Sequence, residues 1–206
     1  SAEGSNLMIT NLDVGKADSA VIEYNGTVGI IDVGTEDAFD KIDAFLKEQD
    51  IDSIDYVILT HFDRDHIGSA VEIITNYDIG SLYIPDYVSE KKYYEDLMDV
   101  AAGLEDVNVV KELTVFYLDD IKVEVVPADD PEAIIEEGDD VDNNMSLLTK
   151  FIYGSKIFLF TGDVEKNRIS QMLEDDYELN ADWIKLPHHN DFRSEERRVG
   201  KECRSR

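Results

Sequence analysis

The chain has 206 residues, which suits one domain of ordinary size, and 43% of them are hydrophobic and can fill a core. Its 47 acidic and 19 basic residues give a formal net charge of -28, and such a surface repels nucleic acids and anionic membranes unless cations intervene. No apolar run approaches the length of a membrane span, and a single cysteine, Cys203, excludes an intrachain disulfide.

The two ends of the chain differ from the rest. Residues 1–6 are small and polar and lack an initiating Met, as after removal of a signal peptide or lipoprotein anchor, which would make the protein extracytoplasmic. An arbitrary fragment start of a cytoplasmic protein fits equally, so localisation stays open. Residues 193–206, RSEERRVGKECRSR, turn abruptly basic and match the translation of a sequencing-adapter oligonucleotide. We expect residues 7–192 to form an incomplete native domain and residues 193–206 to be adapter read-through.

The first half of the chain alternates strand and helix patterns. Strands are expected at residues 7–12, 19–24, 27–31, 56–59 and 81–84, with an Asn25-Gly26 hairpin turn and with Pro85 closing the last strand. Apolar residues at helical spacing predict helices at residues 38–46, 67–74 and 93–104. This alternation is typical of an α/β fold.

The stretch that follows strand 56–59 reads His-x-Asp-x-Asp-His. It places His61, Asp63, Asp65 and His66 in one tight loop at the end of a buried strand. Imidazole and carboxylate groups together suit Zn²⁺, Mn²⁺ or Fe²⁺. A polar loop with a capping Asp is the alternative, but a cap needs far fewer charges. The sequence therefore predicts a metal site here.

Asp32 lies at the end of the buried strand that starts at Thr27. A carboxylate in that position is costly unless it is paired or bound. Two interpretations stay open: Asp32 steadies the metal-binding loop, or it is an ordinary turn or cap residue.

The second half of the chain is richer in strand patterns. Strands are expected at residues 109–110, 114–118, 121–126, 147–153, 156–160 and 183–186, and a helix at residues 165–175. Residues 129–142 are strongly acidic and are interpreted as a solvated loop. A cation-binding loop is the alternative, but the stretch lacks the spacing of an EF-hand.

Several stretches, in this order along the chain, resemble the ComEC-like branch of the metallo-β-lactamase superfamily, which contains the C-terminal hydrolase domain of a DNA-uptake channel protein. They are residues 12–18 (LDVGKAD), residues 61–66, the weaker Asn143-x-x-Ser146, Thr161-Gly162-Asp163 and Leu186-Pro187-His188-His189. Asp63 stands where most superfamily members have a second His. The branch usually continues with Gly and Ser after the last motif, whereas this chain has Asn190-Asp191. The resemblance covers residues 8–190 and implies a C-terminally truncated αββα sandwich.

The resemblance also implies a set of site residues. Two divalent ions, Zn or Mn, would be held by His61 and Asp63 on one side, by Asp65, His66 and His188 on the other, and by Asp163 as a bridge. Asp65 and His189 are the implied catalytic residues, with His189 protonating a leaving group, orienting a phosphate or supporting a ligand. The implied supporting or substrate-contacting residues are Asp13, Asp18, Asp32, Asn143 and Ser146.

The function implied is hydrolysis of phosphodiesters, DNA included, by a hydroxide held at a two-metal site. The acidity of the chain argues against tight binding of long nucleic acids. A small-molecule phosphodiester, or another small ester or lactone, is therefore an open alternative as substrate. A non-catalytic metal-binding module that kept the fold is a second alternative. The sequence predicts no oligomeric state.

Overall fold

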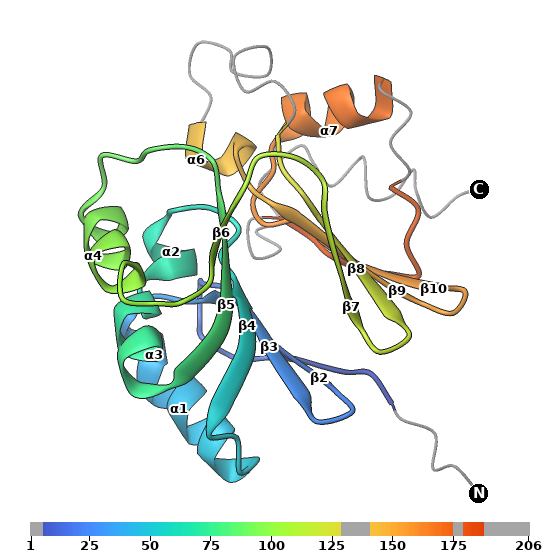
Figure 1. Cartoon of the computed structure of the whole chain (residues 1–206). Coiled ribbons are helices and arrows are strands. Elements are labelled where there is room, and N and C mark those ends of the chain that lie inside the picture. The colour runs from blue at the N-terminus through green and yellow to red at the C-terminus, as the bar shows by residue number, and fades with distance from the viewer. Residues whose placement is uncertain (1–5, 129–140, 175–178, 188–206) are drawn as a thin grey trace, which may run out of the picture. The chain divides into compact units, whose positions relative to one another are not determined.

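The structure is a computed structural model, and it describes residues 6–128, 141–174 and 179–187. The chain forms two compact units, residues 1–111 and 112–206. Each unit has its own β-sheet and its own helices, and each is described by itself (Figure 1).

The first unit is built on a six-stranded sheet in the order β1-β2-β3-β4-β5-β6. Strands β1 to β3 are antiparallel neighbours, whereas β3 to β6 run parallel to one another. Asn25 and Gly26 join β2 to β3 with φ values of 51° and 83°, as the predicted Asn-Gly hairpin turn requires. The strands are Met8–Asn11, Ser19–Tyr24, Thr27–Val33, Ser53–Ile58, Asp78–Pro85 and Val107–Val110.

Helices cover one face of this sheet (Figure 1). Their buried apolar residues, such as Ile42 of α1 and Leu97 of α4, join one core cluster with the strand residues Ile30 and Val57. The predicted apolar stripes thus face the sheet, as expected for amphipathic helices that follow buried strands. The helices are η1 (Glu36–Ala38), α1 (Phe39–Glu48), α2 (Arg64–Ile67), α3 (Ala70–Asn76) and α4 (Lys92–Ala101).

The helix predicted at residues 67–74 is in fact two short helices, α2 and α3, separated at Gly68 and Ser69. A Cβ on Gly68 would lie 2.5 Å from the backbone nitrogen of Glu36, so this turn rests directly on the chain after β3. The Ser69 hydroxyl donates to the Thr35 carbonyl on the same segment. These contacts, which apolar periodicity does not reveal, divide the predicted helix.

The second unit has a five-stranded sheet in the order β11-β10-β9-β8-β7. All neighbours are antiparallel except β10 and β11. Met172 of helix α7 packs in a small core with Leu148 and Leu159 of the sheet. The elements are β7 (Thr114–Leu118), β8 (Ile121–Val126), α6 (Val141–Asn144), β9 (Leu148–Tyr153), β10 (Lys156–Phe160), α7 (Lys166–Glu174) and β11 (Trp183–Lys185).

Some predictions fall wholly or partly outside the described residues. These are the acidic loop except its last two residues, the histidines His188 and His189, and the tail at residues 193–206. Asn143 of the Asn-x-x-Ser stretch belongs to the short helix α6. None of the helices in the described part of the chain has the length and apolar character needed to cross a bilayer.

Candidate metal centre

Asp32 occupies a buried position at the end of β3. Its exposed fraction is 2% and its φ is 56°, a left-handed value that non-glycine residues adopt uncommonly, though Asp and Asn more often than others. Because β3 and β4 are parallel neighbours, their carboxyl ends place Asp32 beside Thr60. Asp32 Oδ1 accepts a hydrogen bond from the Thr60 backbone N–H at 2.8 Å, and Oδ2 accepts from the Thr60 hydroxyl at 2.8 Å. Asp32 thus holds the start of the His-x-Asp-x-Asp-His loop.

Thr60 connects this carboxylate to both histidines of the loop. Its hydroxyl oxygen lies 3.0 Å from Nδ1 of His61 and 3.5 Å from Nδ1 of His66. The His66 Nδ1 also lies 2.8 Å from Asp32 Oδ2. Since the hydroxyl hydrogen is directed at Asp32, its oxygen accepts from His61, and both rings carry hydrogen on Nδ1. Nε2 is then the ring nitrogen that would bind a metal ion.

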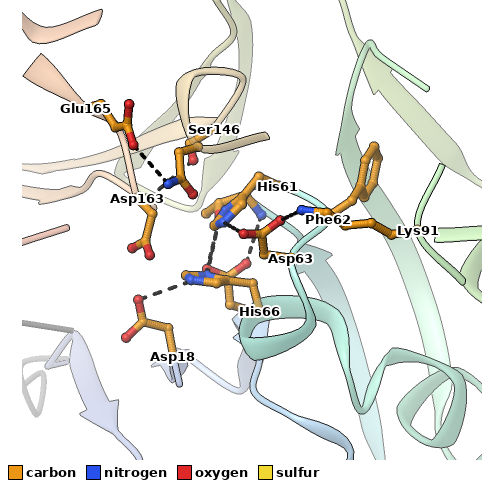
Figure 2. Close-up of polar contacts among 12 residues, drawn as sticks. Asp18, His61, Phe62, Asp63, His66, Lys91, Ser146, Asp163 and Glu165 are labelled. Carbon is orange, nitrogen blue, oxygen red and sulfur yellow. Dashed lines mark hydrogen bonds and ion pairs between the residues drawn. The ribbon is translucent and has the colours of Figure 1, made fainter. Parts of the chain in front are cut away.

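The two histidines are fully buried, and their ring centroids are 4.0 Å apart. Asp18 lies on the other side of His66, with its Oδ2 at 4.0 Å from Nδ1 (Figure 2). One ligand atom from each of Asp18, Asp32 and His66 falls within 4.8 Å of the others. The Asp18 backbone N–H donates to the Asp65 carbonyl, which attaches helix α2 to the chain before β2.

The carboxylates of the loop lie at the start of α2. Asp63 precedes the helix, and its Oδ2 is 3.9 Å from His61 Nε2. The other oxygen of Asp63 is paired with Lys91 (Figure 2). Asp65 is half-buried on α2, one residue before His66. The first unit therefore brings the four residues of the motif together, along with Asp18 and Asp32.

Asp13 lies apart from this cluster. Its side chain is exposed and accepts from the Gly15 N–H within its own turn, and its carbonyl accepts from Lys41.

Aromatic side chains hold Phe62 in the middle of the loop. Its N–H donates to the Tyr87 hydroxyl at 2.9 Å, and its ring centroid is 4.7 Å from those of Tyr87 and Tyr94. Both tyrosines pack partly buried against the core of the first unit.

In the second unit, Asp163 is buried in the turn after β10. Its backbone N–H donates to the Ser146 hydroxyl at 3.2 Å. Both residues are labelled in Figure 2. Lys185, at the end of β11, lies with Nζ 3.8 Å from Asp163 Oδ1. Burial lowers the pKa of Lys185 to about 7, because removing an ammonium from water disfavours its charged form.

Asn143, a predicted supporting residue, is connected to the turn that carries Asp163 through Glu165. Asn143 Nδ2 donates to one oxygen of Glu165 at 3.2 Å, and Asn144 Nδ2 donates to the other at 3.3 Å. The Glu165 carboxylate thereby connects the end of α6 to the turn that carries Asp163.

Residues in these networks that were not singled out from the sequence include Thr60, Lys91, Glu165 and Lys185. The sequence could have pointed to Thr60 and Lys185 by their positions, because Thr60 directly precedes the histidine motif and Lys185 closely precedes His188. Nothing in the sequence distinguishes Lys91 or Glu165, since a Lys or a Glu at the start of a helix in an acidic chain is an ordinary surface residue.

The donors of the first unit fit a divalent cation. Two buried imidazoles are oriented through hydrogen bonds at Nδ1, and carboxylates flank them. Metal-binding histidines are usually oriented in this way, by a hydrogen bond from the ring nitrogen that does not bind the metal.

The family profile described as the metallo-β-lactamase superfamily matches residues 12–201. The chain belongs to this superfamily. The curated "ComE operon protein 3" of Bacillus subtilis (strain 168) is 30% identical over 146 residues, which are 70% of this chain and 18% of that protein. The chain thus aligns with less than a fifth of this relative's length, and the predicted ComEC-like resemblance is confirmed.

Solved metallo-β-lactamases share the fold. A Thermotoga maritima protein assigned to this group is 17% identical, covers 89% of this chain and 96% of its own, and has a TM-score of 0.61. The enzyme from Novosphingobium pentaromativorans is 13% identical, covers 90% of this chain and 75% of its own, and has a TM-score of 0.58. These likenesses confirm the predicted α/β fold with two sheets and helices, and superfamily membership implies a metal-dependent hydrolase in general.

Proposed function

We propose that this chain is a phosphodiester hydrolase that works with two divalent metal ions, zinc or manganese. The observation that carries the proposal is the network in which Asp32 and Thr60 hold His61 and His66 by their Nδ1 atoms. A buried core does not require such an arrangement for its stability, because apolar residues in the same positions would pack as well. It does serve metal binding, which requires neutral imidazoles in a set orientation.

The proposed ligands are those that the resemblance assigns: His61, Asp63, Asp65, His66, Asp163 and His188. When bound, the ions would activate water and stabilise charge on the attacking and leaving oxygens. The chain's own residues do the rest. Asp32 and Thr60 set the histidine tautomers, Ser146 holds the backbone of Asp163, and Lys185 places a second group beside its carboxylate.

The choice of metal follows from the donor set. Three of the six proposed ligands are carboxylates, and the usual second His is replaced by Asp63. Oxygen-rich sites suit Mn²⁺ better than nitrogen-rich ones do. We therefore propose that Mn²⁺ supports activity at least as well as Zn²⁺.

The choice of substrate rests on two supports. The motif resembles that of the ComEC-like branch, and a curated relative carries the name ComE operon protein 3. The net charge of -28 opposes contact with a long polyanion. Small phosphodiesters are therefore the proposed first substrates, and DNA is proposed as a substrate when cations screen the chain.

The test combines metal analysis with an activity panel. We expect about two divalent ions per chain, and hydrolysis of bis(p-nitrophenyl) phosphate in preference to a carboxylic ester or a lactone. His61→Ala and Asp65→Ala should each abolish turnover while circular dichroism stays unchanged. Protein that binds no metal, even with added Zn²⁺ or Mn²⁺, would contradict the proposal. Activity on the ester or lactone alone would reassign the substrate, and bound metal without turnover would indicate a binding module.

A further inference from the structure

Asp63 and Lys91 occupy the positions that precede two helices, yet neither side chain caps its helix. Both backbones are extended, with φ and ψ of -77° and 148° at Asp63 and of -77° and 140° at Lys91, and no side-chain cap hydrogen bond is made. An Asp at this position ordinarily accepts from the first backbone N–H groups, whereas a Lys there opposes the helix dipole. Residues that break a local rule are expected at functional sites.

The two side chains pair with each other instead, across 28 residues of sequence. Lys91 Nζ donates to Asp63 Oδ1, and Asp63 Oδ2 lies 3.9 Å from His61 Nε2 (Figure 2). One carboxylate therefore faces an ammonium through one oxygen and an imidazole of the motif through the other.

The backbone of Lys91 is well anchored, while its side chain is partly exposed to solvent. Its carbonyl accepts from two N–H groups in the first turn of α4, and its N–H donates to the Ser89 hydroxyl. The preceding residues are attached to the loop by the bond from the Phe62 N–H to the Tyr87 hydroxyl. The Lys91 side chain is 43% exposed, against 21% for Asp63. The Lys91 ammonium is therefore accessible to solvent while it pairs with Asp63.

We propose that Lys91 is a built-in counter-cation of Asp63 that competes with the metal ion at the position of His61 and Asp63. This inference rests on the proposed function, because it requires a cation at that position. Lys91 neutralises Asp63 while no ion is bound, and its charge repels a divalent ion that approaches the same carboxylate. The position of His61 and Asp63 therefore binds its ion more weakly than the position of Asp65 and His66, and Lys91 sets the difference.

The experiment uses the full chain after its metal ions have been removed with a chelator. This metal-free protein is titrated with Mn²⁺ alone, and the heat of binding is measured by calorimetry. The wild type should show two binding steps of unequal affinity. Lys91→Met should tighten the weaker step by about tenfold, without changing the tighter step or the total number of ions. Lys91→Arg, which keeps the charge, should restore the wild-type difference.

Lys92→Met is the matched control. Lys92 is the neighbouring residue, and it pairs with Asp96 one turn along α4, away from the loop. Lys92→Met should leave both binding steps unchanged. If it tightens the weaker step as much as Lys91→Met does, the inference is overturned in favour of a simple effect of net charge. Unchanged or weaker Mn²⁺ binding in folded Lys91→Met would overturn the inference alone. Absence of Mn²⁺ binding in every form would overturn the proposed function and this inference with it.

Discussion

At the scale of single residues, Asp32 has the most demanding role in the first unit. Its two oxygens receive three donors: the Thr60 N–H, the Thr60 hydroxyl and the His66 Nδ1–H. An Asn at this position would place an NH₂ group against at least one of these donors, whichever way its amide is turned. No other side chain of the same size accepts all three.

Asp32→Asn should therefore weaken metal binding by about 10- to 100-fold. It should also lower the free energy of unfolding of the metal-free protein by about 1–3 kcal/mol, since a buried donor loses its acceptor. Chelator competition measures the first effect and urea unfolding the second. Asp55→Asn is the control, because Asp55 accepts from the Val28 N–H in the same sheet but away from the loop. Equal metal affinity in Asp32→Asn and wild type would contradict the role given to Asp32.

At the scale of elements, the site depends on how closely α2 approaches the chain after β3. A Cβ on Gly68 would lie 2.5 Å from the carbonyl oxygen of Arg64 and 2.5 Å from the nitrogen of Glu36. Both atoms belong to the backbone, so the new methyl group can be accommodated only if α2 is distorted or the chain after β3 moves. Because α2 carries Asp65 and His66, its distortion would shift two proposed ligands.

Gly68→Ala should destabilise the protein by about 1–3 kcal/mol through overpacking and should weaken metal binding. Gly103→Ala is the matched control, since the nearest atom to its Cβ would be 3.4 Å away. Its stability should be unchanged or raised by up to about 1 kcal/mol, because Ala restricts the unfolded chain. Urea unfolding and Mn²⁺ titration of both variants check this expectation. Equal behaviour of the two variants would show that the close approach of α2 is unimportant.

At the scale of the whole molecule, the net charge of -28 should govern the choice between substrates. A long DNA strand meets repulsion from the entire surface, whereas a small phosphodiester carries one charge and meets much less. At physiological ionic strength, salt largely screens interactions between exposed charges that are more than about 8 Å apart.

Raising KCl at a fixed Mn²⁺ concentration should therefore increase kcat/KM for single-stranded DNA severalfold and change kcat/KM for bis(p-nitrophenyl) phosphate little. The small substrate serves as the control for effects of salt on the metal centre itself. Proteins that bind DNA through basic contacts show the opposite trend, because salt weakens those contacts. A fall in the rate on DNA with added salt would show that a local basic surface outweighs the net charge.

Local patterns were enough to predict most elements, the order of the motifs and the superfamily. Strand alternation, helical spacing and the Asn25-Gly26 turn reflect the geometry of the backbone within a few residues, so they can be read without knowledge of the fold. His61, Asp63, Asp65 and His66 could likewise be singled out as candidate ligands from the sequence, because all four lie in one short loop.

The partners of those residues depend on tertiary structure. Asp32 meets Thr60, and Lys91 meets Asp63, only because parallel strands joined by helices bring their carboxyl ends to one edge of the sheet. Each of these pairs is separated by 28 residues, and no local period encodes such a distance. The division of the predicted helix at Gly68 has the same origin, since the contact that causes it comes from the chain after β3. Sequence thus predicts which groups can bind a metal ion, whereas the packing of the strands decides which neighbours orient and neutralise them.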